Sequence, residues 1–109
     1  MVETADNIND QHPLADIDQI IHAPARLMIL VTLYVVESLD YVFLKNQTNL
    51  SWGNLATHLN KLEEAGYIEI TKGYQGKKPH SLIQLTPQGR QEFKNYKNKL
   101  KGILDDLPD

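Results

Sequence analysis

Residues 49–68, NLSWGNLATHLNKLEEAGYI, give the clearest indication of the fold. The Ser51 hydroxyl can accept a hydrogen bond from a free backbone N–H, so a helix is expected to begin directly after it. Large apolar residues then recur at spacings of three and four, which places them on one helix face. They are Trp52, Leu55, Leu59 and Leu62. Gly66 suits the left-handed residue that ends a helix, and an alternating, strand-like segment follows it.

The opposite face of this helix carries side chains that suit a DNA groove. Short polar groups that donate and accept hydrogen bonds can reach base edges, and asparagine pairs well with adenine. Gly53 would let the backbone approach closely, and the N–H groups at the helix start can bind a phosphate. The predicted contacts are Ser51, Gly53, Asn54, Thr57, His58 and Lys61. The alternative is a solvated polar face with a hydroxyl cap that serves stability alone.

A β-hairpin is expected after this helix. Residues 67–72 alternate in polarity, residues 81–85 do so less cleanly, and the glycine-containing segment 73–80 between them reads as a loop. Lys77, Lys78 and His80 would stand at its tip, with Lys72 nearby. We predict phosphate contacts for these four residues, although lysines on a loop tip can also serve solubility alone.

Three helices are expected before residue 49. Apolar residues at 14, 17, 20 and 21 predict a short amphipathic helix, after a polar and mobile tail over residues 1–13. Residues 24 to about 37 are apolar nearly all round, which is typical of a central helix that several neighbours cover. Asp40 can cap a third helix, residues 41 to about 47, with Val42, Phe43 and Leu44 directed inward.

A last helix is expected from Thr86, its cap, to about Leu104. Its apolar residues follow a heptad spacing that is typical of a helix with a partner helix. We predict a dimer interface from both ends of the chain, built from Leu14, Ile17, Ile21, Phe93, Tyr96, Leu100, Ile103 and Leu107. The alternative is that the last helix packs on its own domain.

This order of elements predicts a winged helix-turn-helix. The expected fold class is mainly α with a small β-hairpin, in a single domain over residues 14–107 that carries N- and C-terminal dimerisation helices. The length of 109 residues suits one such domain.

Composition argues against several other classes. The chain has no cysteine, and its histidines at 12, 22, 58 and 80 lack metal-ligand spacing. There is no glycine-rich phosphate loop, so we expect no enzyme, no metal and no cofactor. No cationic segment precedes the first apolar run, and the longest run, residues 27–36, is about half of what a membrane span needs. We expect a cytoplasmic protein without a membrane partner.

The charge is divided unevenly along the chain. The net charge is −3, but residues 1–40 hold seven acidic residues against one basic residue. Residues 41–101, which carry the proposed recognition helix and hairpin, hold ten basic residues against four acidic ones. A nearby ligand responds to this local excess of positive charge rather than to the net charge.

Several local sequences resemble the winged-helix transcriptional regulators of the MarR and ArsR types, in particular their short one-domain group. The matching pieces are Arg26-Leu27-x-Ile29-Leu30, Leu55-x-x-His58-Leu59-x-Lys61-Leu62-Glu63-x-Ala65-Gly66-Tyr67-Ile68, Lys77-Lys78-Pro79 and Leu85-Thr86-x-x-Gly89-Arg90. The resemblance implies a homodimer on a near-palindromic operator, with the helix after Ser51 in the major groove of double-stranded DNA. The hairpin tip would lie against the backbone or in the minor groove.

We therefore expect a sequence-specific regulator that acts as a repressor by occupying its operator. The cysteine ligands that ArsR-type metal sensors often use are absent, and the resemblance points to no particular small-molecule effector. The acidic net charge keeps one alternative open, a winged-helix module that binds other proteins without significant DNA binding.

Overall fold

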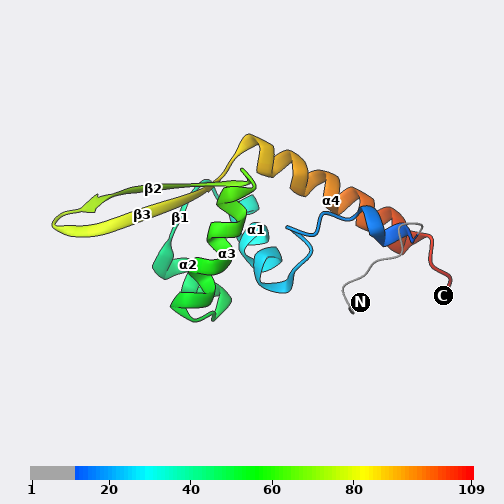
Figure 1. Ribbon diagram of the computed structural model, residues 1–109, viewed down its shortest axis with the longest axis horizontal. Helices are drawn as coiled ribbons and strands as arrows, with labels where there is room; N and C mark the ends of the chain where they lie inside the picture. Colours follow the sequence, from blue (N-terminus) through cyan, green and yellow to red (C-terminus); the bar gives the residue numbers. More distant parts are fainter. Residues whose placement is uncertain (1–11) are drawn as a thin grey trace, which may run out of the picture.

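The computed structural model describes residues 12–109, so most of the tail expected over residues 1–13 lies outside the described residues. In chain order the elements are η1 (Pro13–Asp16), α1 (Pro24–Val35), β1 (Leu39–Asp40), α2 (Tyr41–Thr48), α3 (Trp52–Glu64), β2 (Ile68–Gln75), β3 (Lys78–Leu85) and α4 (Pro87–Asp105). The winged-helix order expected from the sequence is thus present (Figure 1).

The sheet has three antiparallel strands in the order β1-β3-β2. Strands β2 and β3 pair continuously from Ile68 opposite Leu85 to Gln75 opposite Lys78, and only Gly76 and Lys77 form the turn. The expected loop over residues 73–80 is therefore wrong, because most of it is strand. These outer positions are exposed on both faces, so no hydrophobic alternation marks them in the sequence.

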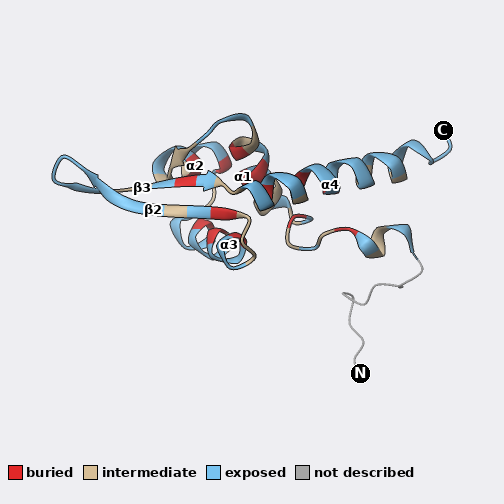
Figure 2. Ribbon diagram, turned by 90° about the horizontal axis from the view of Figure 1, so that it is seen from above, coloured by how far each residue is buried: buried red, intermediate tan, exposed pale blue. Residues whose placement is uncertain are grey.

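The hairpin and α4 project from opposite ends of the molecule (Figure 1). The principal-axis extents are accordingly unequal, at 54 × 33 × 24 Å. Figure 2 shows buried residues where the helices meet the base of the hairpin, and mostly exposed residues along the outer hairpin and outer α4. Within residues 12–109, no helix combines the length and the apolar character needed to cross a membrane.

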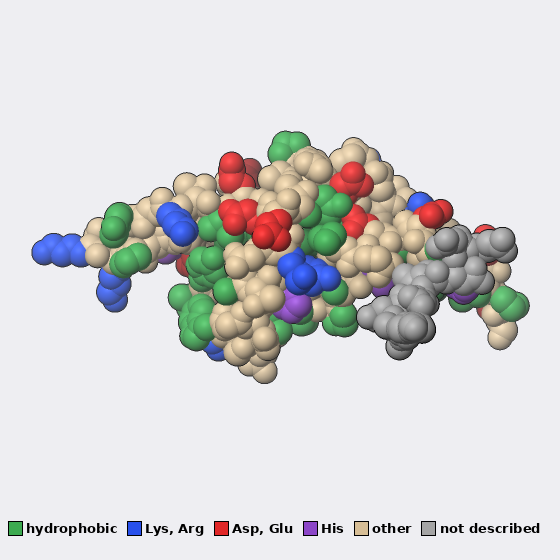
Figure 3. Space-filling model, viewed as in Figure 1, with side chains coloured by type: hydrophobic (Ala, Val, Ile, Leu, Met, Phe, Trp, Pro, Cys, Tyr) green, Lys and Arg blue, Asp and Glu red, His purple; other side chains and the backbone are tan. Residues whose placement is uncertain are grey.

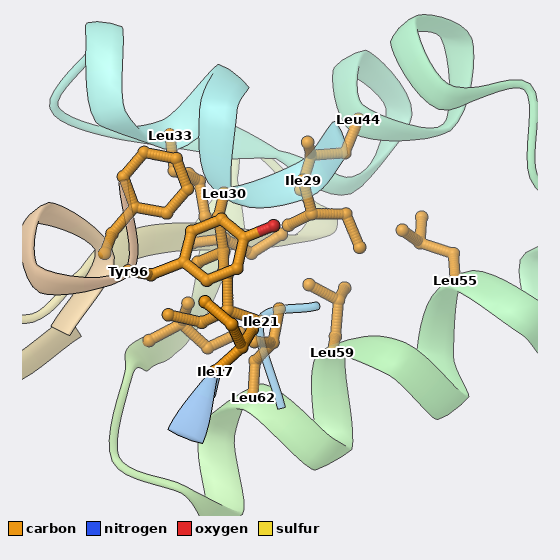
Figure 4. Packing of buried hydrophobic residues seen from close by; sticks show 13 residues of the cluster. Ile17, Ile21, Ile29, Leu30, Leu33, Leu44, Leu55, Leu59, Leu62 and Tyr96 are labelled. Carbon is orange, nitrogen blue, oxygen red and sulfur yellow. The ribbon is translucent and has the colours of Figure 1, made fainter. Parts of the chain in front are cut away.

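The core draws residues from both ends of the chain and from between them (Figure 4). It consists of Ile17, Ile21, Ile29, Leu30, Leu33, Leu44, Leu55, Leu59, Leu62, Ile68, Ile83, Phe93 and Tyr96. Helix α1 contributes three of these, but its Met28, Val31 and Val35 are exposed. The expectation that α1 is covered on several sides is therefore only partly right.

Two other expectations about packing are wrong. In α2 only Leu44 of the three apolar residues is buried, and Val42 and Phe43 are exposed, because the short helix contacts the core along one side. The amphipathic helix expected near residues 14–21 is a four-residue 3-10 turn. Asp18 Oδ1 accepts the backbone N–H groups of Ile20 and Ile21, and this competes with continued helix.

A junction joins the end of α3, the start of β2 and the start of α4. Gly66 has φ of 82°, and the Tyr67 N–H donates to Leu62 O at 3.0 Å, which completes a left-handed helix end. The Thr86 hydroxyl donates to Gly66 O at 2.6 Å and accepts from the Gly89 N–H at 2.9 Å. A Cβ on Gly89 would lie 2.0 Å from Tyr67 O, so only glycine allows α4 to approach this closely.

Candidate nucleic-acid interface

Helix α3 has one buried side and one exposed side, and the predicted reading residues lie on the exposed side. The Ser51 hydroxyl accepts the Asn54 N–H at 3.1 Å and starts the helix. Leu55, Leu59 and Leu62 are fully buried. Of the residues predicted to contact DNA from this helix, His58 is half-buried. The others are exposed, namely Ser51, Gly53, Asn54, Thr57 and Lys61. The helix thus presents hydrogen-bonding side chains to solvent from a firmly packed base.

Trp52 departs from the apolar stripe that the sequence indicates. Its side chain is 54% exposed, and the Lys45 ammonium lies 5.3 Å from its ring centroid. Trp52 is the first residue of α3 and lies one turn before Leu55, which is the first residue of the stripe that is buried in the core. The structure therefore adds an exposed aromatic ring and a paired cation to the start of α3, which periodicity alone could not reveal.

His58 is held by a residue of another helix. Arg26 of α1 donates from Nη1 to His58 Nδ1 at 3.1 Å. Burial lowers the pKa of His58 below its ordinary value, and the charges of Arg26 and Lys61 lower it further. At neutral pH the ring is therefore uncharged. Reasoning from the sequence missed the role of Arg26, for which the available signal was an arginine inside an otherwise apolar helix.

The predicted cations of the hairpin do not all lie at its tip. Lys77 in the turn, Lys78 beside it and Lys72 along β2 are exposed, and Figure 3 shows basic side chains at the outer end of the hairpin. His80 lies further in, opposite Gly73, and its Nε2 is 3.4 Å from Asp40 Oδ2. Its expected place at the tip is therefore wrong, because the longer strands move it toward the domain.

Asp40 meets His80 while also capping α2. Its Oδ1 accepts the Phe43 N–H at 2.7 Å, and this bond is the main cause that lowers the pKa of Asp40, with a smaller contribution from His80. This contact ties the inner part of the hairpin to the start of α2.

The residues predicted for dimerisation divide into two groups. Ile17, Ile21, Phe93 and Tyr96 are buried in the core of their own domain, and the Tyr96 hydroxyl lies 2.9 Å from His22 Nδ1. Leu14, Leu100 and Ile103 are partly buried at the edge of this core, and Leu107 is 60% exposed. Packing of α4 on its own domain thus occupies the inner part of the heptad and leaves the outer part at the surface.

No cluster of three or more metal-ligating side chains occurs among residues 12–109. Three features could contact a polyanion: the polar face of α3, the exposed Trp52 and the basic end of the hairpin.

Comparison with known proteins identifies a family and a related protein. A family model described as a winged helix DNA-binding domain matches residues 25–104. An uncharacterised protein of Methanocaldococcus jannaschii is 40% identical over 78 residues, which cover 72% of this chain and 85% of that protein.

Two solved structures have the same fold. A transcriptional regulator homologue from Pyrococcus horikoshii OT3 superposes with a TM-score of 0.77 at 27% identity, covering 83% of this chain and 91% of that one. A putative MarR-family transcriptional regulator from Porphyromonas gingivalis W83 has a TM-score of 0.67 at 20% identity, covering 93% and 98%. The winged-helix fold expected from the sequence is confirmed.

Proposed function

The chain belongs to the winged helix DNA-binding domain family and is a DNA-binding transcriptional regulator, and on this basis we propose that it is a repressor that binds a near-palindromic operator as a homodimer. The observation that carries the proposal is the division of α3 into a buried apolar side and an exposed polar side beside a projecting basic hairpin. The proposal keeps the expected cytoplasmic location.

Helix α3 is the proposed reading element. A helix fits the B-DNA major groove, and residues near its start usually contact the base edges. Asn54, Thr57 and His58 would contact bases, while the backbone N–H groups after Ser51, unobstructed at Gly53, would bind a phosphate. Lys61 would reach a phosphate from the second half of the helix.

The hairpin supplies the proposed backbone contacts. Lys72, Lys77 and Lys78 are exposed along its length and can follow the phosphates beside the groove. Lys45, held over the Trp52 ring, adds a cation at the start of α3. His80 is not assigned a contact, because its side chain turns toward Asp40.

The outer part of α4 and the residues directly after it form the proposed dimer contact. The exposed side chains of Leu104 and Leu107 continue the apolar edge that Leu100 and Ile103 begin, and Leu14 of the N-terminal segment belongs to the same edge. A two-fold interface of this kind would present two α3 helices to the two halves of a palindromic site.

DNA binding through the hairpin is tested by the double variant Lys77→Glu/Lys78→Glu in a fluorescence-anisotropy titration of duplex DNA over a salt series. If each lysine meets one phosphate, the slope of log affinity against log salt becomes shallower by about 1.8 per protomer. The matched control is Lys94→Glu/Lys97→Glu, which makes the same charge change at exposed positions of α4. Equal effects of the two double variants would show that only net charge matters and would remove the hairpin from the interface.

The dimer is tested by Leu104→Glu/Leu107→Glu with light scattering. Both side chains are more than half exposed in the protomer, so the domain should keep its fold while the contact is lost. Asn98→Glu, at an exposed position of the same helix, is the control. A dimer that persists in the double variant would exclude this part of α4 as the interface.

Repression and the operator are tested in the cell and with its genome. Selection of bound genomic fragments should return a near-palindromic sequence, and expression of the protein should lower the output of a reporter under that sequence. An increase in reporter output would identify an activator instead.

A further inference from the structure

Arg26 occupies a central place between the N-terminal segment and α3. Its Nε donates to Ile20 O at 2.5 Å and its Nη2 to Gln19 O at 3.3 Å, while Nη1 donates to His58 Nδ1 at 3.1 Å. The guanidinium is therefore held from two sides, and its planar arrangement of donors leaves it little freedom to turn. A side chain of the proposed reading face thus has a fixed partner from another helix.

The chemistry of this contact determines where the imidazole carries its proton. A guanidinium has only donors and stays charged, so the His58 nitrogen that faces it must accept. A neutral imidazole has one accepting and one donating nitrogen, and acceptance at Nδ1 leaves the proton on Nε2. The ring cannot exchange the two roles without losing the bond from Arg26.

The structure assigns Arg26 a positioning role: we propose that it holds His58 as the Nε2–H tautomer, so that His58 offers the DNA a hydrogen-bond donor and excludes cytosine at one position of each half-site. The inference rests on the proposed function, because it needs α3 in the major groove. Guanine presents the acceptors N7 and O6 there, adenine presents N7 and thymine presents O4, whereas cytosine presents only the N4 amino donor. A fixed donor on His58 therefore accepts guanine, adenine or thymine and rejects cytosine.

Burial and nearby charges also favour the neutral form of the His58 ring. His58 is half-buried, and its environment lowers its pKa, so the neutral ring persists at pH 7. The charged groups that act on it are Arg26 from α1 and Lys61 from its own helix, and both disfavour a second proton. His58 thus reads the groove as a neutral donor rather than as a cation.

The first test needs no DNA. Long-range ¹H–¹⁵N correlation spectra of the free protein report which ring nitrogen carries the proton, and a His58→Gln variant identifies the His58 signals among the four histidines. The expected result is a single neutral Nε2–H tautomer at pH 7. A protonated Nδ1 would overturn the proposal whether or not the protein binds DNA.

The Arg26→Leu and Arg26→Lys variants separate positioning from simple packing. Loss of the donor in Arg26→Leu should add the Nδ1–H tautomer and raise the pKa of His58 toward its ordinary value. Arg26→Lys keeps the positive charge but lacks the planar set of donors, so it should retain the wild-type tautomer only in part. Identical tautomer patterns in wild type and a folded Arg26→Leu variant would overturn the proposed role of Arg26, and the wild-type spectrum decides the tautomer even if that variant fails to fold.

The second test is selection of binding sites from a random duplex library with the wild type, His58→Ala and Arg26→Leu. Wild type should disfavour cytosine at one position per half-site, where cytosine lowers the affinity by about tenfold. His58→Ala should lose this discrimination alone, and Arg26→Leu should tolerate cytosine there. Discrimination against cytosine that survives His58→Ala would refute the inference, whereas absence of any DNA binding by wild type would refute the proposed function and leave the spectroscopic result standing.

Discussion

Gly89→Ala should destabilise the protein even though alanine is the better helix former. A Cβ at this position would lie 2.0 Å from Tyr67 O and 2.7 Å from Tyr67 C, and contacts under 3.0 Å essentially never occur. Both partners are backbone, so no side-chain rotation relieves the overlap. The start of α4 would have to move by about 1 Å, and this would disturb Thr86 and the packing of Phe93.

The expected size follows from two opposing contributions. Replacing a helical glycine gains up to about 1 kcal/mol, whereas overpacking a tight contact costs about 1–3 kcal/mol and occasionally more. With backbone on both sides of the overlap we expect a net loss near 2 kcal/mol, which lowers Tm by roughly 8–16 °C in a domain of this size.

The assay is thermal and urea unfolding followed by circular dichroism, with Gly102→Ala as the matched control. Gly102 lies in the same helix, and a Cβ there meets nothing within 4 Å. Gly102→Ala should therefore raise the free energy of unfolding by up to about 1 kcal/mol. If Gly89→Ala is as stable as Gly102→Ala, the close approach of α4 to Tyr67 is not what requires glycine.

Three further predictions concern caps and titrating groups. Ser51→Ala removes the acceptor for the Asn54 N–H and should cost about 1 kcal/mol in urea unfolding, whereas Ser51→Asp should cost much less. Burial, and then the hydrogen bond to Asp18, raise the pKa of Tyr67 from its usual 10.0. The free energy of unfolding should therefore fall as the pH rises above about 10. Tyr67→Phe should make that fall shallower in urea unfolding from pH 8 to 11. The pKa of Asp40 is lowered from 3.8, mainly by the Phe43 N–H, so its contribution to stability is present above that pH and is lost as the pH falls below it. Asp40→Asn keeps a cap without charge and should weaken the loss of stability in acid. The same loss of stability in acid for this variant and the wild type would contradict the prediction.

Local interactions made much of the fold predictable. Ser51, Asp40 and Thr86 each accept a backbone N–H three residues later, so the start of each helix is recorded within a few residues of sequence. The spacing of Leu55, Leu59 and Leu62 likewise identified the buried side of α3. These signals act between residues on the same turn or on neighbouring turns, where the spacing in the sequence fixes which side chains lie close together.

Other features depend on partners distant in the chain. The contact between Arg26 and His58 joins residues 32 positions apart, and the outer ladder of the hairpin joins strands whose exposed positions show no alternation. Spacing in the sequence identifies side chains that share a face. It does not reveal what covers that face, because the hydrophobic effect is non-directional.

The sequence alone predicted helices α1 to α4, the side-chain caps of α2, α3 and α4, and the polar side of α3, because these features depend on interactions within one or two turns. The packing of the whole chain was needed to show that Trp52 is exposed and that Phe93 and Tyr96 are buried in the core of their own domain. An apolar stripe gains much the same free energy against any apolar surface, so the surface that covers it is selected only when the whole chain packs.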